Sequence, residues 1–363
     1  MAELDPALST FISSMPKVEL HLHLEGAVRP ETLLELSRNK SGLRQQVDEW
    51  IAARRAQRFC YGNFREFLVA FGIISLLLET PQDYALATTR LIEWLAEQKV
   101  LYTEIIFAAG VVLWKKQPVD ATFEAVAAAA EEAGSRKGVR VKWIFDATRH
   151  FGMDHVLEVL HWAARYRSRG VAAFGIGGDE AGGPARLFPE IYREARDLGL
   201  HTVAHAGEAC GPESIRDAVE LLGAERIGHG LTALRDPNVM AMLRERRIPL
   251  EVCPSSNVST GLIARFEDHP LPQFLKEGLV VTLNSDDPGM FGTSLEEEFD
   301  RAARCFGLSR QTLAGFIRNA VNASFLTEDE KLMLEEQLKV NGGMDKPGQP
   351  SPPALKTEAP RWK

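Results

Sequence analysis

Eight short apolar runs, separated by long connections, constrain the fold of this chain more than any other feature. The runs are near-continuous rather than alternating, which is typical of parallel strands covered on both faces. Helical patterns lie between most of them, and strands that alternate with helices form right-handed βαβ units. Eight such units predict an α/β fold closed into a (β/α)8 TIM barrel. The predicted strands span residues 18–24, 101–107, 139–145, 171–176, 201–205, 226–229, 249–253 and 280–284.

The connection between the first two predicted strands, about residues 25–100, is far longer than the others and contains helical patterns. We interpret it as a helical insertion after the first strand. It leaves the barrel on the face where strands end and helices begin, so it lies beside any site built there. Four apolar residues of the insertion recur at helical spacing, and they either pack it onto the barrel or form a hydrophobic gate over the substrate. They are Phe64, Phe67, Leu68 and Phe71.

Residues 1–340 are expected to form one domain, and residues 341–363 a disordered tail. The chain has 363 residues, more than the roughly 250 of a bare barrel, so the insertion and the tail account for the excess. The tail is rich in proline, glycine and polar residues, a composition that cannot bury a core.

Composition excludes several classes of protein. The formal net charge is −8 and no basic block occurs, so nucleic acid is not an expected partner. No apolar run approaches 18 residues, and the N-terminus lacks a basic region followed by an apolar stretch, so neither a membrane span nor a signal peptide is expected. The four cysteines are scattered, which fits a reducing compartment, and we expect a cytoplasmic protein.

Histidines and acids gather where the predicted strands end. His21 and His23 are two residues apart in the first strand, so both rings lie on the inner face. A lone buried histidine is more often a hydrogen-bonded core residue than a ligand. Together, however, these groups would bury a costly polar cluster at the mouth of the barrel, and a metal ion removes that cost. The others follow later strands: His205, Glu208, His229, Asp286 and Asp287.

Three imidazoles and one carboxylate suit Zn²⁺, with Fe²⁺, Co²⁺ and Mn²⁺ as competitors. We predict His21, His23, His205 and Asp286 as the ligands, with one position left for water. Glu208 lies three residues after a predicted ligand and is the expected acid/base, the alternative being a structural salt bridge.

Signatures of other chemistries are missing from the sequence. There is no HxE…PCxxC pattern of cytidine-type deaminases, no GxSxG and no Walker loop. The glycine-rich stretch 175–183 matches no phosphate-binding spacing, and we interpret it as a place where a ligand approaches the backbone.

Taken together, these motifs resemble the adenosine deaminase family of the amidohydrolase superfamily over about residues 16–330. The matching segments, in family order, are HLHLEGA, GGDE, HAGE, GHG and NSDDP. Two-metal members of that superfamily usually need a carboxylated lysine, and no lysine lies between Lys142 and Lys276, which favours one zinc ion per chain. The resemblance implies that Glu208 protonates purine N1 and that His229 orients the attacking hydroxide. The third implied catalytic residue, Asp287, hydrogen-bonds the hydroxide and purine N7, and the other implied substrate contacts are His23, Glu25 and Gly178 (N3).

The expected partner is a small-molecule purine nucleoside, and the substituent at its 5′ position is left open. Adenosine deaminases usually carry an aspartate where this chain has Glu25. Adenosine or 2′-deoxyadenosine is nevertheless the first choice. The rival is 6-aminodeoxyfutalosine, whose 5′ benzoate would need a cation, for which Arg149 or Arg29 is suggested. Adenine as substrate, or an inactive nucleoside-binding barrel, is less favoured.

Overall fold

The computed structural model describes residues 4–38, 40, 43–57 and 59–340. The predicted disordered tail, residues 341–363, lies outside the described residues. The observed strands are β1 Lys17–His23, β2 Val100–Phe107, β3 Arg140–Thr148, β4 Val171–Gly177, β5 His201–Ala206, β6 Arg226–His229, β7 Leu250–Val252 and β8 Val281–Leu283.

The eight strands lie in sequence order and each pairs in parallel with the next. Closure comes from a parallel bridge between Leu22 of β1 and Asp286, just after β8. There the His23 N–H donates to the Asp286 carbonyl over 2.9 Å, and the Asp286 N–H donates to the His21 carbonyl over 3.1 Å. The predicted (β/α)8 barrel is therefore confirmed, and its closing seam carries three of the predicted metal ligands.

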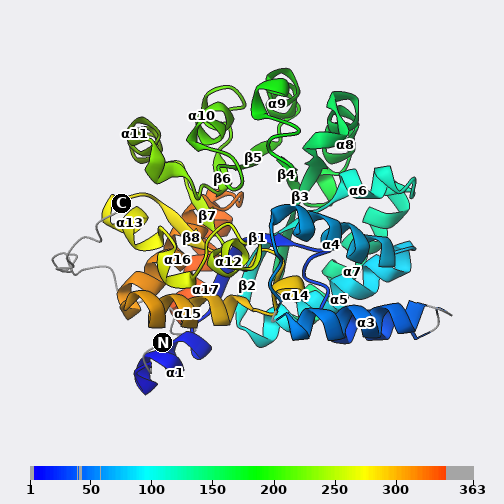
Figure 1. Ribbon diagram of the computed structural model, residues 1–363, viewed down its shortest axis with the longest axis horizontal. Helices are drawn as coiled ribbons and strands as arrows, with labels where there is room; N and C mark the ends of the chain where they lie inside the picture. Colours follow the sequence, from blue (N-terminus) through cyan, green and yellow to red (C-terminus); the bar gives the residue numbers. More distant parts are fainter. Residues whose placement is uncertain (1–3, 39, 41–42, 58, 341–363) are drawn as a thin grey trace.

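Helices surround the barrel, with α8 to α11 outside strands β3 to β6 (Figure 1). Many of these helices have proline in their first turn, where its fixed φ suits the helix and its missing N–H costs no hydrogen bond. Among the described helices, none is long and apolar enough to cross a membrane. The helices are α1 Pro6–Ser14, α2 Pro30–Leu36, α3 Leu43–Ala56, α4 Phe64–Leu77, α5 Pro81–Glu97, α6 Ala109–Trp114, α7 Val119–Lys137, α8 Met153–Arg165, α9 Pro189–Asp197, α10 Pro212–Glu220, α11 Pro237–Glu245, α12 Pro254–Ser259, α13 Leu271–Lys276, α14 Pro288–Phe291, α15 Leu295–Phe306, α16 Arg310–Ala323 and α17 Glu328–Val340.

The insertion between β1 and β2 consists of α2 to α5. Helix α5 packs closely on α7, which anchors the insertion to the outside of the barrel. Helix α4 carries Phe67, which is buried, and Phe71, whose ring centroid lies 6.1 Å from that of His23. The insertion therefore reaches the mouth of the barrel, as its position in the sequence predicts.

Strand β3 is three residues longer than the prediction at its C-terminal end. The predicted run ended at Phe145, because the polar residues Asp146 and Thr148 interrupt the apolar pattern. In the structure Asp146 pairs with Gly175 and Thr148 with Gly177, so the strand continues along β4. The extension carries a carboxylate into the barrel mouth.

An ion-pair cluster crosses the barrel interior below the mouth. Arg226 of β6 is 1% exposed and its guanidinium lies between two buried carboxylates, with Nη2 2.6 Å from Glu104 Oε2 and Nε 2.5 Å from Glu251 Oε1. Its Nη1 donates to the Ala323 carbonyl, and Cζ lies 3.9 Å from the centre of the Phe325 ring. Arg226 thus neutralises two acids that parallel strands would otherwise bury uncompensated.

Replacing Arg226 with Met is expected to lower the free energy of unfolding by about 3–5 kcal/mol, because it leaves two carboxylates buried without their cation. Urea unfolding followed by far-UV circular dichroism measures this loss. Arg235→Met, at an exposed position, is the control and should change stability by less than about 0.5 kcal/mol. Equal stability of the two variants would contradict the role assigned to the cluster.

Candidate active site

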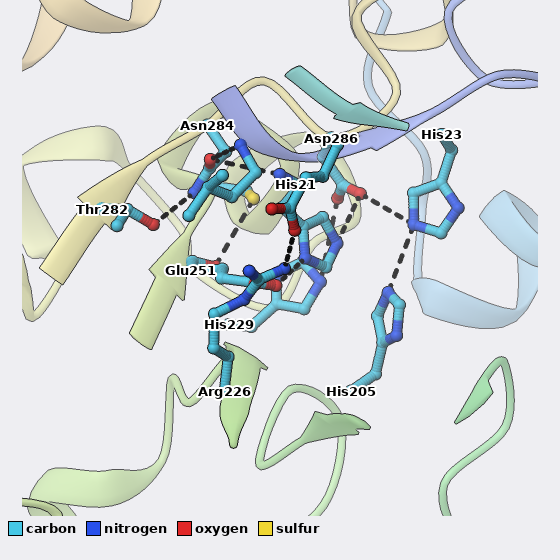
Figure 2. Close-up of polar contacts among 12 residues, drawn as sticks. His21, His23, His205, Arg226, His229, Glu251, Thr282, Asn284 and Asp286 are labelled. Atoms are coloured by element: carbon cyan, nitrogen blue, oxygen red, sulfur yellow. Dashed lines mark hydrogen bonds and ion pairs between the residues drawn. The ribbon is translucent and has the colours of Figure 1, made fainter. Parts of the chain in front are cut away.

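The histidines and acids predicted from the sequence meet at one end of the barrel. His21 and His23 lie on β1 with both rings toward the barrel axis, because alternate residues of a strand share a face. Their side chains gather with those at the ends of β5, β6 and β8 (Figure 2). All seven are at most 9% exposed: His21, His23, His205, Glu208, His229, Asp286 and Asp287.

Four of these residues present donor atoms to a common point. Asp286 Oδ1 lies 3.3 Å from His21 Nε2 and 3.4 Å from His23 Nε2, and His23 Nε2 lies 3.2 Å from His205 Nε2. A tetrahedral zinc site with bonds of about 2.0–2.1 Å separates its ligand atoms by about 3.3 Å. His21 Nε2 is buried and makes no hydrogen bond within the described structure, so it is free to bind a metal. The residues present therefore fit a metal ion.

The outer ring nitrogens of two predicted ligands are held by acceptors. His21 Nδ1 donates to Glu251 Oε2 over 2.7 Å, and His205 Nδ1 donates to the Ile176 carbonyl over 3.1 Å. Each acceptor holds a proton on Nδ1 and turns Nε2 inward, the arrangement that metal-ligating histidines use. Despite desolvation, Asp286 and Glu251 raise the pKa of His21 to about 10, so a metal ion at this ring would replace the proton on Nε2. Glu251 is itself fixed by Arg226, so the ion-pair cluster extends to the site.

His229 is held in the opposite tautomer by a chain of hydrogen bonds. The Leu271 N–H donates to His269 Nδ1, so His269 Nε2 carries the proton and donates to Asn257 Oδ1 over 3.2 Å. The Asn257 amide nitrogen then donates to His229 Nδ1 over 3.2 Å. His229 Nε2 must therefore be protonated, and it lies 3.5 Å from Glu208 Oε1 and 3.9 Å from Asp286 Oδ2. Although His229 stands close enough to His21 and His205 to share a metal, its inner nitrogen is a donor rather than a ligand.

Two of the site residues hold a strained backbone. His229 has φ of +63° and Asp286 has φ of +65°, in the left-handed region that non-glycine residues seldom occupy. Such strain is concentrated at functional sites and persists only where the surroundings enforce it. At Asp286 the surroundings are the two backbone hydrogen bonds that close the barrel.

Burial sets the charges of the site. Desolvation lowers the pKa of His23 to about 3 and that of His229 to about 4, and it holds the pKa of His205 well below its ordinary value. These imidazoles are therefore neutral near pH 7, which is the form that binds metals and donates hydrogen bonds. Burial, assisted by the charge of Asp286, raises the pKa of Glu208 and of Asp287 well above the usual carboxyl range. Glu208 is thus prepared to carry a proton.

Glu180, a residue that the sequence analysis did not single out, holds the loop that carries Glu208. Its Oε1 accepts from the backbone N–H groups of Glu208 and Ala209, each over 2.8 Å, and its Oε2 accepts from the Gly207 N–H over 2.9 Å and from the Ser214 hydroxyl. Several donors on one buried carboxylate leave the loop little freedom. The position of Glu208 is thereby coupled to β4.

Two glycines of the recognised motifs make room for the site. A Cβ atom at Gly26 would lie 1.6 Å from Asp287 Oδ1, so the carboxylate can occupy its place only beside glycine. Gly178 has φ of +91° and directs its backbone toward the mouth of the barrel, as expected for a backbone contact with a ligand. Asp287 Oδ1 is buried without a hydrogen-bond partner among the described residues, so it is available to a ligand.

A cavity of about 180 Å³ opens above these residues. Its outer wall is apolar and comes from α4, α6 and the end of β3. Helix α4 contributes Phe64, Phe67, Leu68 and Phe71, so the four apolar residues of the insertion reach the cavity. The stacked rings of Trp114 and Phe151, 5.9 Å apart, line the same cavity. No Lys or Arg is among the described residues that line this cavity.

Three sequence-predicted residues lie elsewhere in this structure. Glu25 is fully buried and does not line the cavity, because its carboxylate accepts a long hydrogen bond from the Ala108 N–H. Arg149 donates to the carbonyls of Gly183 and His205 (Nε and Nη1, respectively), and Arg29 stacks over the Trp94 ring. Neither arginine lines the cavity, so the suggested cation for a benzoate is not found there.

Sequence reasoning also missed Glu251, Asn257 and His269. Cys253, which stands near His21 and Asp286, is not a comparable ligand, because burial raises the pKa of its thiol well above the ordinary value. The signal for Glu251 was a lone acid within an apolar strand, which demands a buried partner. Nothing in the local sequence pairs Asn257 with His269, which approach through the fold of the connection after β7.

Comparisons with known proteins agree with this geometry. The family model described as adenosine deaminase matches residues 16–340. The aminodeoxyfutalosine deaminase of Streptomyces avermitilis is 36% identical over 91% of this chain and 92% of that protein. The structure of adenine deaminase from Arthrobacter aurescens superposes with a TM-score of 0.82 at 28% identity, covering 90% of this chain and 98% of that chain. A zinc-bound amidohydrolase from Burkholderia ambifaria gives a TM-score of 0.83 at 26% identity, covering 93% of each chain.

Nitrogen-15 NMR of the metal-loaded protein is expected to show His229 protonated at Nε2 and unprotonated at Nδ1. Asn257→Ala should abolish this preference, because it removes the donor that occupies Nδ1. Ser256→Ala is the control, since it deletes a buried hydroxyl without a hydrogen-bond partner on the same helix, and it should leave the tautomer unchanged. A wild-type proton on Nδ1 would contradict the assignment.

Proposed function

Because this chain belongs to the adenosine deaminase family, we propose that it is a zinc-dependent hydrolase that removes the 6-amino group from a purine nucleoside. Deaminases of this family are hydrolases that act on C–N bonds of cyclic amidines, and this chain is one of them. The observation that supports the proposal best is the donor geometry, in which three inward imidazole nitrogens and Asp286 meet below a cavity that is lined by Glu208.

The proposed zinc ligands are His21, His23, His205 and Asp286. A bound zinc ion lowers the pKa of water from about 15.7 toward about 7, which supplies hydroxide at neutral pH. The neutral state of His23 and His205, and the outer hydrogen bonds of His21 and His205, support binding of a divalent cation. The zinc-bound structural relative supports zinc over the other divalent metals.

Glu208 is the proposed general acid. Burial raises its pKa, which favours the protonated carboxyl that can transfer a proton to purine N1. Protonation at N1 draws electrons from C6 and makes that carbon susceptible to attack. Glu180 holds the Glu208 loop in place, so the acid is positioned before the substrate arrives.

His229 and Asp287 are proposed to act on the attacking oxygen and on N7, respectively. The Nε2–H of His229 can donate a hydrogen bond to the attacking oxygen and stabilise the charge that develops there. Asp287, protonated because burial and Asp286 raise its pKa, can donate to N7. The Gly178 backbone is the proposed partner of N3. Water adds to C6, the amino group leaves as ammonia, and the product is a 6-oxopurine.

Adenosine or 2′-deoxyadenosine is the proposed substrate. The outer wall of the cavity is aromatic and lacks cations among its described residues, so it suits an uncharged substituent better than a charged one. The second candidate is 6-aminodeoxyfutalosine, because a relative 36% identical to this chain carries the name aminodeoxyfutalosine deaminase. The aromatic rings would suit its aryl group, whereas its carboxylate has no arginine in the cavity.

The proposal is tested by the kcat/KM of zinc-loaded protein for adenosine, 2′-deoxyadenosine, 6-aminodeoxyfutalosine and adenine, measured as ammonia release under one condition. We expect adenosine or 2′-deoxyadenosine to lead by about tenfold or more, equivalent to about 1.4 kcal/mol in transition-state binding. A lead by 6-aminodeoxyfutalosine would establish the second candidate. Release of no ammonia from any of them would refute the deaminase proposal.

Replacing Glu208 with Gln is expected to lower kcat by about 10²- to 10⁴-fold, because the amide cannot give a proton to N1. Zinc content, measured by atomic emission, should stay at one ion per chain. Glu213→Gln is the matched control, since Glu213 lies in the first turn of α10 and does not line the cavity, and it should retain wild-type kcat. Unchanged kcat in Glu208→Gln would contradict the assigned role.

A further inference from the structure

Asp146 is a carboxylate in the cavity that the proposed mechanism does not use. It lies on β3, is 8% exposed and lines the same cavity as Gly177, Gly178 and Glu208. The glycines of β4 provide its space. A Cβ atom at Gly175 would lie 3.3 Å from Asp146 Oδ1, and one at Gly177 would lie 2.8 Å from Oδ2. The glycine-rich strand end therefore accommodates this acid beside the ring of His205.

No donor within the described part of the chain forms a hydrogen bond with the Asp146 carboxylate. The nearest cation in the sequence, Arg149, donates to the carbonyls of Gly183 and His205, and its charge acts on Asp146 without a hydrogen bond between the two side chains. Burial accordingly raises the pKa of Asp146 to about 7. Asp146 also stands outside the three groups of side chains whose donor atoms could share a metal ion. A desolvated carboxylate without a partner is costly, and a ligand that brings a donor removes that cost.

The order of strands around the barrel shows which part of a purine Asp146 would face. In the proposed function N1 meets Glu208 after β5, N3 meets Gly178 after β4, and N7 meets Asp287 after β8. Around the ring, N9 lies between N3 and N7 on the side away from N1 and C6. Around the barrel, the strands between β4 and β8 on the corresponding side are β3, β2 and β1. N9 and its substituent therefore face the side of the barrel that carries Asp146.

Glu25, which follows β1, is another carboxylate on that side of the barrel. It is fully buried against the Ala108 N–H and does not line the cavity. His150 does line the cavity, but its Nδ1 accepts from the Asp179 N–H, so its ring offers a donor rather than an acceptor. Among the described lining residues near β3, Asp146 is thus the charged acceptor.

We propose that the Asp146 carboxylate accepts a hydrogen bond from a neutral donor at or beyond N9 of the substrate, and so determines specificity for that part of the molecule. The donor is either a hydroxyl of the sugar or, for a free base, the N9–H itself. This inference rests on the proposed function, because the orientation of the purine is taken from it.

The experiment pairs changes in the enzyme with deletions of donors in the substrate. Zinc-loaded wild type, Asp146→Ala and Asp146→Asn are assayed for kcat/KM with adenosine, 2′-deoxyadenosine, 3′-deoxyadenosine, adenine and 9-methyladenine. In wild type, deletion of the recognised donor should lower kcat/KM by about 10- to 100-fold, as expected for a hydrogen bond to a charged group. In Asp146→Ala the same deletion should cost less than about twofold, because the acceptor is already gone.

The pattern of losses identifies the donor. A loss confined to one deoxynucleoside assigns that hydroxyl, and a loss from adenine to 9-methyladenine assigns N9–H. Asp154→Ala, an exposed acid on α8 that does not line the cavity, should match wild type throughout. If Asp146→Ala does not fold, as judged by circular dichroism, the nearly isosteric Asp146→Asn supplies the comparison and should show a reduced dependence on the same donor.

Three results would overturn the assignment. Equal losses in wild type and in the Asp146 variants, for every substrate pair, would show that Asp146 recognises none of these donors. Loss of zinc from a folded Asp146 variant would place the residue in the metal site instead. Absence of deamination by wild type with every 6-aminopurine tested, including the two candidate nucleosides, would refute the proposed function and this inference with it. In contrast, if wild type deaminates these substrates but the Asp146 variants lose as much kcat/KM as wild type on each donor deletion, the proposed function stands and only this inference fails.

Discussion

The carboxylate of Glu251 contacts both Arg226 and His21, and so connects the stability of this barrel to its candidate active site. One oxygen lies against the Arg226 guanidinium and the other accepts from His21 Nδ1 (Figure 2). Arg226 is held in turn by Glu104, the Ala323 carbonyl and the Phe325 ring. Desolvation favours the neutral acid, but the Arg226 guanidinium and the hydrogen bond from His21 hold the pKa of Glu251 below its ordinary value, so the carboxylate remains charged. The orientation of His21, the first of the proposed metal ligands, is therefore set by the interior of the barrel rather than by the loops above it.

The second organising feature is a division of the histidines into two tautomers. Acceptors outside His21 and His205 leave their inner nitrogens as lone pairs, whereas the amide of Asn257 leaves His229 with an inward N–H. In the proposed site, histidine would thus serve both as a metal ligand and as a hydrogen-bond donor a few ångströms apart. The strained backbone at His229 and Asp286 directs both side chains into this arrangement, and the hydrogen bonds across the β1–β8 seam keep Asp286 there.

Much of this could be predicted from the sequence, for reasons that particular residues illustrate. Apolar runs with long helical connections predicted the barrel, and the i, i+2 spacing of His21 and His23 predicted that both rings share its inner face. Residues whose role depends on distant partners were missed, since Asn257, His269 and Glu180 act through contacts formed by separate connections. Glu251 was visible as one acid within a predicted apolar strand, and Asp146 as an acid directly after one, but the sequence does not show which partner such an acid meets. The burial of Glu25 likewise follows from packing against β2 and α6.

The central claim is that hydrogen bonds behind the histidines decide which of them bind the metal. A crystal structure of the zinc-loaded protein with data at the zinc absorption edge tests it most directly. The account predicts one anomalous peak with bonds of about 2.0–2.2 Å to His21 Nε2, His23 Nε2, His205 Nε2 and Asp286, and with His229 Nε2 beyond bonding distance. A peak bonded to His229, or placed away from His21 and His205, would contradict it.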